Sequence, residues 1–225
     1  MNLTAAQIVK DACAIAKCPG FISQAGRALN FVLNDLVLHR NLKVNLVTGS
    51  SVIPAGSNGP FALEANYLRT YDLCYTVAGT TYFLSPGSLR EYDQDSGVDQ
   101  GGEPYEWSSD LSVSPGLLYI YPYSNTQITL RHRYYLLQDD IVMPETSATV
   151  PWFTDQDYLI QATAARLMRI TDDDRYQSFM ADCEHMLGIH LLTEGDEQQV
   201  VKEVALDPRR FKLRGGLKRT KDNPW

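Results

Sequence analysis

The sequence predicts a mixed α+β protein: a helical bundle of N- and C-terminal helices, an inserted antiparallel β domain and an extended C-terminal tail. Apolar residues recur at helical spacing near both ends of the chain. Between them, residues 44–150 are rich in Tyr, Thr, Val, Gly and Pro, the composition of strands and turns. The predicted parts are residues 1–43 (N-terminal helices), 44–150 (β-rich insertion), 151–205 (C-terminal helices) and 206–225 (basic arm).

Two helices are predicted at the start of the chain. Thr4 and Gln7 have the spacing of a capping box, so a helix should begin there and run to about residue 17. Pro19-Gly20 ends it. A second helix is predicted over residues 23–39, with one apolar face that contains Leu29, Val32, Leu33 and Leu36.

The β-rich insertion contains several short runs that alternate or are rich in β-branched and aromatic residues. Val52-Ile53 ends one such run at Pro54, and Ala78-Gly79 predicts a turn. The predicted strands are residues 67–77, 80–84, 105–107, 117–121 and 127–135.

The connections between these strands carry their own signals. Residues 85–92 predict one short helix, with Ser85 as N-cap and Pro86 in the first position. Residues 93–104 combine glycines with acids and predict a mobile loop. Residues 122–126 predict the hairpin turn between the last two strands. Residues 138–150 predict a linker back to the helices.

Two further helices are predicted after Pro151-Trp152-Phe153. The first covers residues 155–170, with Thr154 as N-cap and small residues on a broad apolar face. The second begins after the acidic corner Asp172–Asp174, whose carboxylates suit a helix N-terminus. Its apolar stripe consists of Tyr176, Phe179, Met180, Cys183, Leu187 and Leu191. Residues 197–205 fit helix and strand equally well.

Charge is distributed unevenly along the chain. The formal net charge is −7, but residues 205–225 hold seven Lys/Arg against two Asp, a net charge of +5. The remaining 204 residues therefore carry −12. Phe211, Leu213, Leu217 and Trp225 interleave with the basic residues, which favours an arm that docks on a partner over a solvated end.

The sequence lacks the common catalytic and nucleotide-binding motifs. The nucleophile-elbow, zinc-protease, P-loop and dinucleotide-binding motifs are all missing, and no cofactor or metal site is predicted. Asp172–Asp174 can bind a divalent cation or simply begin a helix, and the second interpretation is favoured. Residues 131–135 contain basic and aromatic side chains that fit either a phosphate contact or an alternating strand. The four cysteines are expected to be free thiols.

The order of these parts resembles the head-to-tail adaptor (connector) proteins of tailed bacteriophages, especially those with short tails. The resemblance covers roughly residues 4–192. It is carried by the Leu-rich helix that ends at Leu38-His39-Arg40, by Leu118–Pro122 (L-Y-I-Y-P) before a turn, and by Pro151-Trp152-Phe153 before the Ala-rich helix segment 162–167.

The resemblance implies a non-enzymatic ring of twelve copies in the neck of a virion, synthesised in the host cytoplasm. Its partners would be further copies of itself, the portal protein, the tail nozzle protein and, as a further partner, a tail fibre. Genomic DNA would pass through the channel without specific binding, and no membrane is involved. Portal contacts fall on the C-terminal arm, at Arg209, Arg210, Phe211, Lys212, Leu213, Arg214 and Trp225. Nozzle contacts fall on the glycine-rich loop, at Asp95, Gly97, Gly101, Gly102 and Glu103.

Three other functions stay open at this point. Another phage neck or tail-completion protein would belong to the same structural class with a different partner. A carbohydrate-active hydrolase would need paired carboxylates in a cleft, with Glu103, Glu106 and Asp110 as the candidates. A DNA-binding protein would need a basic face, which only the arm supplies.

Overall fold

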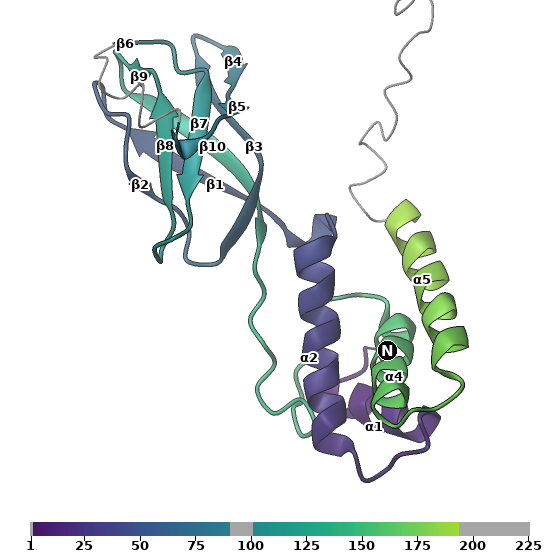
Figure 1. The fold of residues 1–225 in the computed structure, drawn as a ribbon. Coiled ribbons are helices and arrows are strands. Elements are labelled where there is room, and N and C mark those ends of the chain that lie inside the picture. Colours follow the sequence, from purple (N-terminus) through teal and green to yellow (C-terminus); the bar gives the residue numbers. More distant parts are fainter. Residues whose placement is uncertain (1, 91–100, 194–225) are drawn as a thin grey trace, which may run out of the picture.

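A computed structural model describes residues 2–90 and 101–193 of the chain. Within these residues, helices gather at one end of the molecule and strands at the other (Figure 1). The mixed α+β class predicted from the sequence is confirmed. We call the two parts the helical unit and the β unit. The helical unit consists of α1 (Ala5–Ile15), α2 (Ile22–His39), α4 (Gln156–Ile170) and α5 (Tyr176–Thr193).

The β unit follows a short 3₁₀ turn, η1 (Lys43–Asn45), and contains two four-stranded sheets and one small two-stranded sheet. The first sheet has the order β1-β10-β3-β4 and the second the order β2-β8-β7-β5. The strands are β1 (Leu46–Ile53), β2 (Phe61–Ala62), β3 (Tyr67–Val77), β4 (Thr80–Phe83), β5 (Ser85–Pro86), β6 (Gly101–Gly102), β7 (Glu106–Asp110), β8 (Leu117–Tyr121), β9 (Tyr123–Ser124) and β10 (Ile128–Leu136).

The first helix begins where the sequence predicted. Thr4 and Gln7 form both hydrogen bonds of the capping box. The N–H groups of Ala5 and Ala6 donate to backbone carbonyls of the linker, at Thr149 (2.8 Å) and Ser147 (3.2 Å). The first N–H groups of α1, which have no partner within the helix, are thus satisfied partly by a segment more than 140 residues away.

Helix α4 lies at the centre of the helical unit and contacts α1, α2 and α5. Its buried face combines Ala162, Ala164 and Ala165 with Leu159 and Leu167. Small side chains allow the three neighbouring helices to approach closely. The aliphatic residues of α4 then join one continuous apolar core with residues from all four helices.

The entry into α4 differs from the prediction in its cap. Asp155, and not Thr154, is the N-cap, and its carboxylate accepts the Tyr158 N–H at 3.0 Å. Phe153 is buried just before this cap, and its ring centroid lies 5.5 Å from Tyr158 and 4.6 Å from His190 of α5. Phe153, at the end of the linker, therefore packs against both α4 and α5.

Helix α5 buries most of the stripe that the sequence indicated, but Met180 is only half-buried and lies outside the core cluster. Cys183, Leu187 and Leu191 are buried, and Tyr176 and Phe179 pack against the same core. One apolar side of α5 therefore covers α4, while its other sides expose both charged residues, such as Asp182 and Glu184, and the apolar Ile189 and Leu192.

The two larger sheets of the β unit enclose a second apolar core. Leu73 and Leu130 contribute from the first sheet, and Leu118 and Ile120 from the second. Strand β10 alternates strictly over its first five residues, with Ile128, Leu130 and His132 buried and the residues between them exposed. Burial lowers the pKa of His132 to about 4, so this inward imidazole is neutral at pH 7.

Two predicted connections in the β unit are wrong. Residues 122–126 are not a hairpin turn, because β8 and β10 belong to different sheets and Tyr123–Ser124 form the separate strand β9. Ser85 and Pro86 do not start a helix: they pair in parallel with β7, and the Ser85 N–H donates to the Tyr105 carbonyl at 2.8 Å. Helical residues begin only at Leu89. In both places backbone partners distant in sequence replace the local turn or cap.

The central position of α4 generates a stability prediction. We expect Ala164→Leu to lower the free energy of unfolding by roughly 1–3 kcal/mol, because the larger side chain has no space in the closely packed core. Urea unfolding followed by circular dichroism measures this. The control is Ala181→Leu on the exposed side of α5, which should stay within about 0.5 kcal/mol of the parent. Equal effects of the two variants would contradict close packing around α4.

Candidate functional site

The described part of the predicted nozzle site lies at the end of the β unit farthest from the helices (Figure 1). Gly101 and Gly102, predicted as part of a mobile loop, instead form β6 and pair in parallel with β9. Asp95 and Gly97 lie outside the described residues. We call residues 101–105 together with 121–125 the distal corner.

Close approach of two side chains explains the first glycine of the distal corner. A Cβ on Gly101 would collide with the Asn125 amide oxygen and with the Tyr123 ring. Any larger residue would therefore force these two side chains to move. Gly102 is less constrained, because its Cβ would meet only Pro122, at an ordinary distance of 3.4 Å.

The distal corner is anchored to the core of the β unit by a tyrosine. The buried Tyr75 hydroxyl donates to the Pro104 carbonyl at 3.1 Å. Burial, and then the negative charge of Glu103, raises the pKa of Tyr75, so its proton stays in place to make this bond. Tyr105 is exposed beside Glu103 and packs edge-on against Tyr121, with ring centroids 6.1 Å apart. The corner thus offers an aromatic ring and a carboxylate to a partner on a fixed backbone.

A second site holds the β unit to the helical unit. Arg69 of β3 donates to the carbonyls of Val37 (3.2 Å), Leu38 (3.0 Å) and Arg40 (2.6 Å) at the end of α2. It also donates to the Asn41 side chain at 3.1 Å. These carbonyls have no partner within the helix, and a cation suits the negative end of the helix dipole. The guanidinium also lies 4.9 Å from the centroid of the Tyr135 ring.

The linker is fixed along the side of α2. The Asn30 side chain donates to the Ile141 carbonyl at 3.0 Å and accepts the Ile141 N–H at 3.1 Å. Asn34 donates to Asp140 at 2.8 Å. Two asparagines one helical turn apart therefore hold the extended linker against α2.

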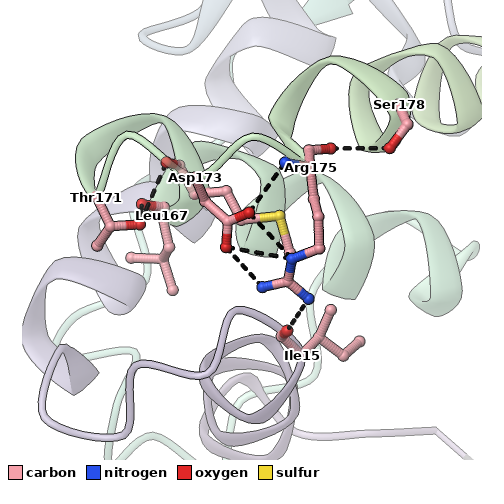
Figure 2. A network of polar contacts seen from close by, with 7 residues as sticks. Ile15, Leu167, Thr171, Asp173, Arg175 and Ser178 are labelled. Atoms are coloured by element: carbon pink, nitrogen blue, oxygen red, sulfur yellow. Dashed lines mark hydrogen bonds and ion pairs between the residues drawn. The ribbon is translucent and has the colours of Figure 1, made fainter.

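A third polar network joins three helices at the corner between α4 and α5 (Figure 2). Asp173 accepts the backbone N–H of Arg175 at 2.9 Å and three hydrogen bonds from its guanidinium, the shortest at 2.6 Å. The same guanidinium reaches the Ile15 carbonyl at the end of α1, at 3.4 Å. The hydrogen bonds from Arg175 hold the pKa of Asp173 at about 2. Figure 2 also shows Thr171 donating back to Leu167 at 3.2 Å.

The basic and aromatic run on β10 fits the strand interpretation better than a phosphate site. His132 and Tyr134 point into the β unit and are buried. The guanidinium of Arg133 is paired with Asp72 on the neighbouring strand and stacks 4.7 Å from the centroid of the Tyr71 ring. Arg133 therefore already has a carboxylate where a phosphate would have to bind.

Two of the three carboxylates considered for hydrolysis, Glu106 and Asp110, lie at opposite ends of β7. Their backbones are therefore about 13 Å apart, whereas paired glycosidase carboxyls lie roughly 5–9.5 Å apart. Hydrogen bonds from Ser112 lower the pKa of Asp110, the opposite of what a general acid needs. The Glu106 carboxylate lies against Gly87.

The described residues contain no cluster of metal ligands and no membrane-spanning helix, and their cysteines are free. Within residues 2–90 and 101–193, no three His, Cys, Asp or Glu side chains are grouped as metal ligands. All four cysteines are buried free thiols. In the same ranges, every helix is too short or too polar to cross a bilayer.

The predicted portal-binding residues fall on the part of the chain that the structure does not describe. These are Arg209, Arg210, Phe211, Lys212, Leu213, Arg214 and Trp225, and residues 197–205 lie there as well. Arg69 and Arg175 were not singled out from the sequence as positioning residues. The available signals were weak: a basic residue in a Tyr-rich strand and one directly after three aspartates.

Neither a scan against protein-family models nor a search of curated proteins returned a match for this chain.

The contacts of Arg69 generate a prediction about coupling between the two parts. We expect Arg69→Lys to lower the free energy of unfolding by about 1–3 kcal/mol. The planar guanidinium donates to four acceptors, and a lysine ammonium cannot donate to all four in this geometry. Urea unfolding can be followed by Trp107 in the β unit and by Trp152 next to the helical unit, in a Trp225→Phe background. The two probes should report separate midpoints in the variant. Arg131→Lys, on the exposed side of β10, is the control and should change neither midpoint.

The lowered pKa of Asp173 generates a pH prediction. Its ionised form is favoured in the folded protein, so the stabilisation is complete above the ordinary Asp pKa of about 3.9 and is lost as the pH falls from there to about 2. Asp173→Asn should therefore unfold more easily than the parent at pH 6, and the difference should vanish by about pH 2. Thermal unfolding between pH 2 and 6 measures this, with Asp172→Asn as the neighbouring control. A difference independent of pH would contradict the ion pair.

Proposed function

We propose that this chain is a structural, non-enzymatic adaptor in the neck of a tailed phage, where copies form a ring beneath the portal and a platform for the tail nozzle. The observation that carries the proposal is the two-part architecture. The distal corner lies at the end of the β unit, far from the helical unit, and Arg69 and the linker hold the two parts in one orientation. Such a shape suits a subunit that contacts different partners at its two ends.

The proposed roles follow the two ends of the molecule. Helical units pack side by side around a ring of twelve copies. The arm contacts the portal through Arg209–Arg214 and Trp225, and the distal corner contacts the nozzle through Gly101–Glu103 together with Asp95 and Gly97. A tail fibre is a further partner. Because each contact is repeated around the ring, individually modest ion pairs are sufficient.

Electrostatics supports the same assignment. The chain outside residues 205–225 carries −12, so a ring of such bodies repels the phosphate backbone of DNA, which can then pass through the channel without specific binding. The arm carries +5 and is attracted to acidic protein surfaces. Another neck or tail-completion protein is the alternative, with the same structural role and different neighbours.

Docking onto purified portal of the same virus tests the proposal. We expect the full chain to form rings on portals, seen by electron microscopy, and neutralisation of Arg209, Arg210, Lys212 and Arg214 to Gln to abolish docking. The control neutralises Lys10 and Arg131, both exposed on the described part of the chain, and should dock normally.

A second arm of the experiment uses the nozzle protein. Glu103→Lys at the distal corner should weaken nozzle binding and leave portal docking unchanged. Rings that never form on portals, or docking that survives neutralisation of the arm, would contradict the proposal.

A further inference from the structure

A groove lies between α1 and α4 on the surface of the helical unit. Its volume is about 390 Å³, and its lining includes the apolar residues Ala14, Ile15 and Ile160 and the polar Gln161. Asp11 of α1 and Asp157 of α4 are the charged residues that line it. A lining that combines apolar residues with two carboxylates suits a segment that alternates basic and apolar side chains.

Both carboxylates are available to a partner. Asp11 and Asp157 are exposed, and in the described part of the chain neither side chain forms an ion pair or a hydrogen bond. Asp72 and Asp173, in contrast, are already engaged with Arg133 and Arg175. The groove is therefore a place where added cations gain new partners without displacing existing ones.

Residues 209–214 of this chain have the complementary pattern. They read Arg-Arg-Phe-Lys-Leu-Arg, so that Phe211 and Leu213 alternate with four cations. A volume of about 390 Å³ accommodates a phenylalanine ring together with a smaller aliphatic side chain. The groove and the segment thus match in both polarity and size.

The end of α5 brings this segment within reach of the groove in the same molecule. Helix α5 ends at Thr193, and its His190 ring lies 4.6 Å from Phe153, two residues before the cap of α4. Asp157 is in the first turn of α4, so the last described residue of α5 lies at the same end of the helical unit as one side of the groove. Fifteen residues separate Thr193 from Arg209, a span of up to roughly 50 Å.

We propose that residues 209–214 dock in the α1–α4 groove of their own copy when no portal is present. This rests on the proposed function for the release step, because the portal then competes with the groove for the same segment. Tethering gives the arm a high effective concentration at the groove, so two ion pairs and one apolar contact are sufficient. The device keeps the basic arm from binding other acidic surfaces before assembly.

Photo-crosslinking in the full chain tests the proposal. A benzophenone analogue of phenylalanine replaces Phe211, the monomeric protein is irradiated, and crosslinked peptides are identified by mass spectrometry. We expect products with residues 11–15 and 157–161. A mixture of ¹⁵N-labelled and unlabelled protein should give products within one isotope only. Products between isotopes, products on other segments, or no product at all would overturn docking in the same copy.

Matched variants test the two carboxylates. Asp11→Lys with Asp157→Lys should lower the yield of groove products by about tenfold or more, because each exposed ion pair contributes up to about fivefold. Asp182→Lys with Glu184→Lys changes the net charge equally on the exposed side of α5 and should leave the yield unchanged. Asp11→Asn with Asp157→Asn, which keeps the side-chain shape, should give an intermediate loss, and circular dichroism confirms folding. Equal losses in the lysine pair and its control would overturn the role of the groove.

Addition of portal separates this proposal from the proposed function. If both hold, portal lowers the yield of groove products. If only the docking holds, groove products form and portal leaves them unchanged. If only the adaptor function holds, the arm binds portal and groove products never form.

Discussion

The geometry of this molecule depends on one guanidinium at the end of a helix. The apolar cores of the helical unit and the β unit share no residue, so burial of apolar surface does not by itself fix one part against the other. Arg69 does so by serving three terminal carbonyls of α2 from a strand of the β unit. Because these acceptors have no other partner in the helix, a rotation of the β unit would leave them unpaired. The hydrogen bonds of Arg69 therefore set the orientation of the two ends of the molecule relative to each other.

The sequence predicted elements whose signals are local. The capping box at Thr4 and Gln7 and the strand Tyr67–Val77 were confirmed at the predicted positions, since each is determined by residues a few positions apart. Ser85-Pro86 carries an equally good local signal for a helix start and was wrong. There, backbone groups of Tyr105 and Trp107, some twenty residues away, offer hydrogen bonds that a helix start cannot provide. A local sequence pattern therefore predicts a helix start only where no neighbouring strand offers hydrogen bonds to the same backbone groups.

The distal corner and the two positioning arginines show the same contrast between local signals and contacts distant in sequence. Gly101, Gly102 and Glu103 were recognised from a glycine- and acid-rich pattern, but the pattern indicated mobility. The structure gives Gly101 a different reason, namely the close approach of Tyr123 and Asn125. Arg69 and Arg175 act on helix ends about 30 and 160 residues away in sequence. No periodicity connects an arginine with a carbonyl so distant, so sequence reasoning had no means to find either.

The uneven charge of the chain gives the two proposals a common physical basis. Bodies with a net charge of −12 arranged in a ring repel one another, and the arm carries a net charge of the opposite sign. When the arm moves from the groove of its own copy to an acidic portal, it exchanges one set of exposed ion pairs for another. The net free energy of this transfer is therefore small. A small difference per copy suffices for a switch, because an equilibrium shifts only by the differential affinity of its two states, and repetition around a ring multiplies that difference. An arm with strong, buried contacts at either place would lose this reversibility. The modest, solvent-exposed carboxylates Asp11 and Asp157 are therefore better suited to hold it before assembly than a deep apolar pocket would be.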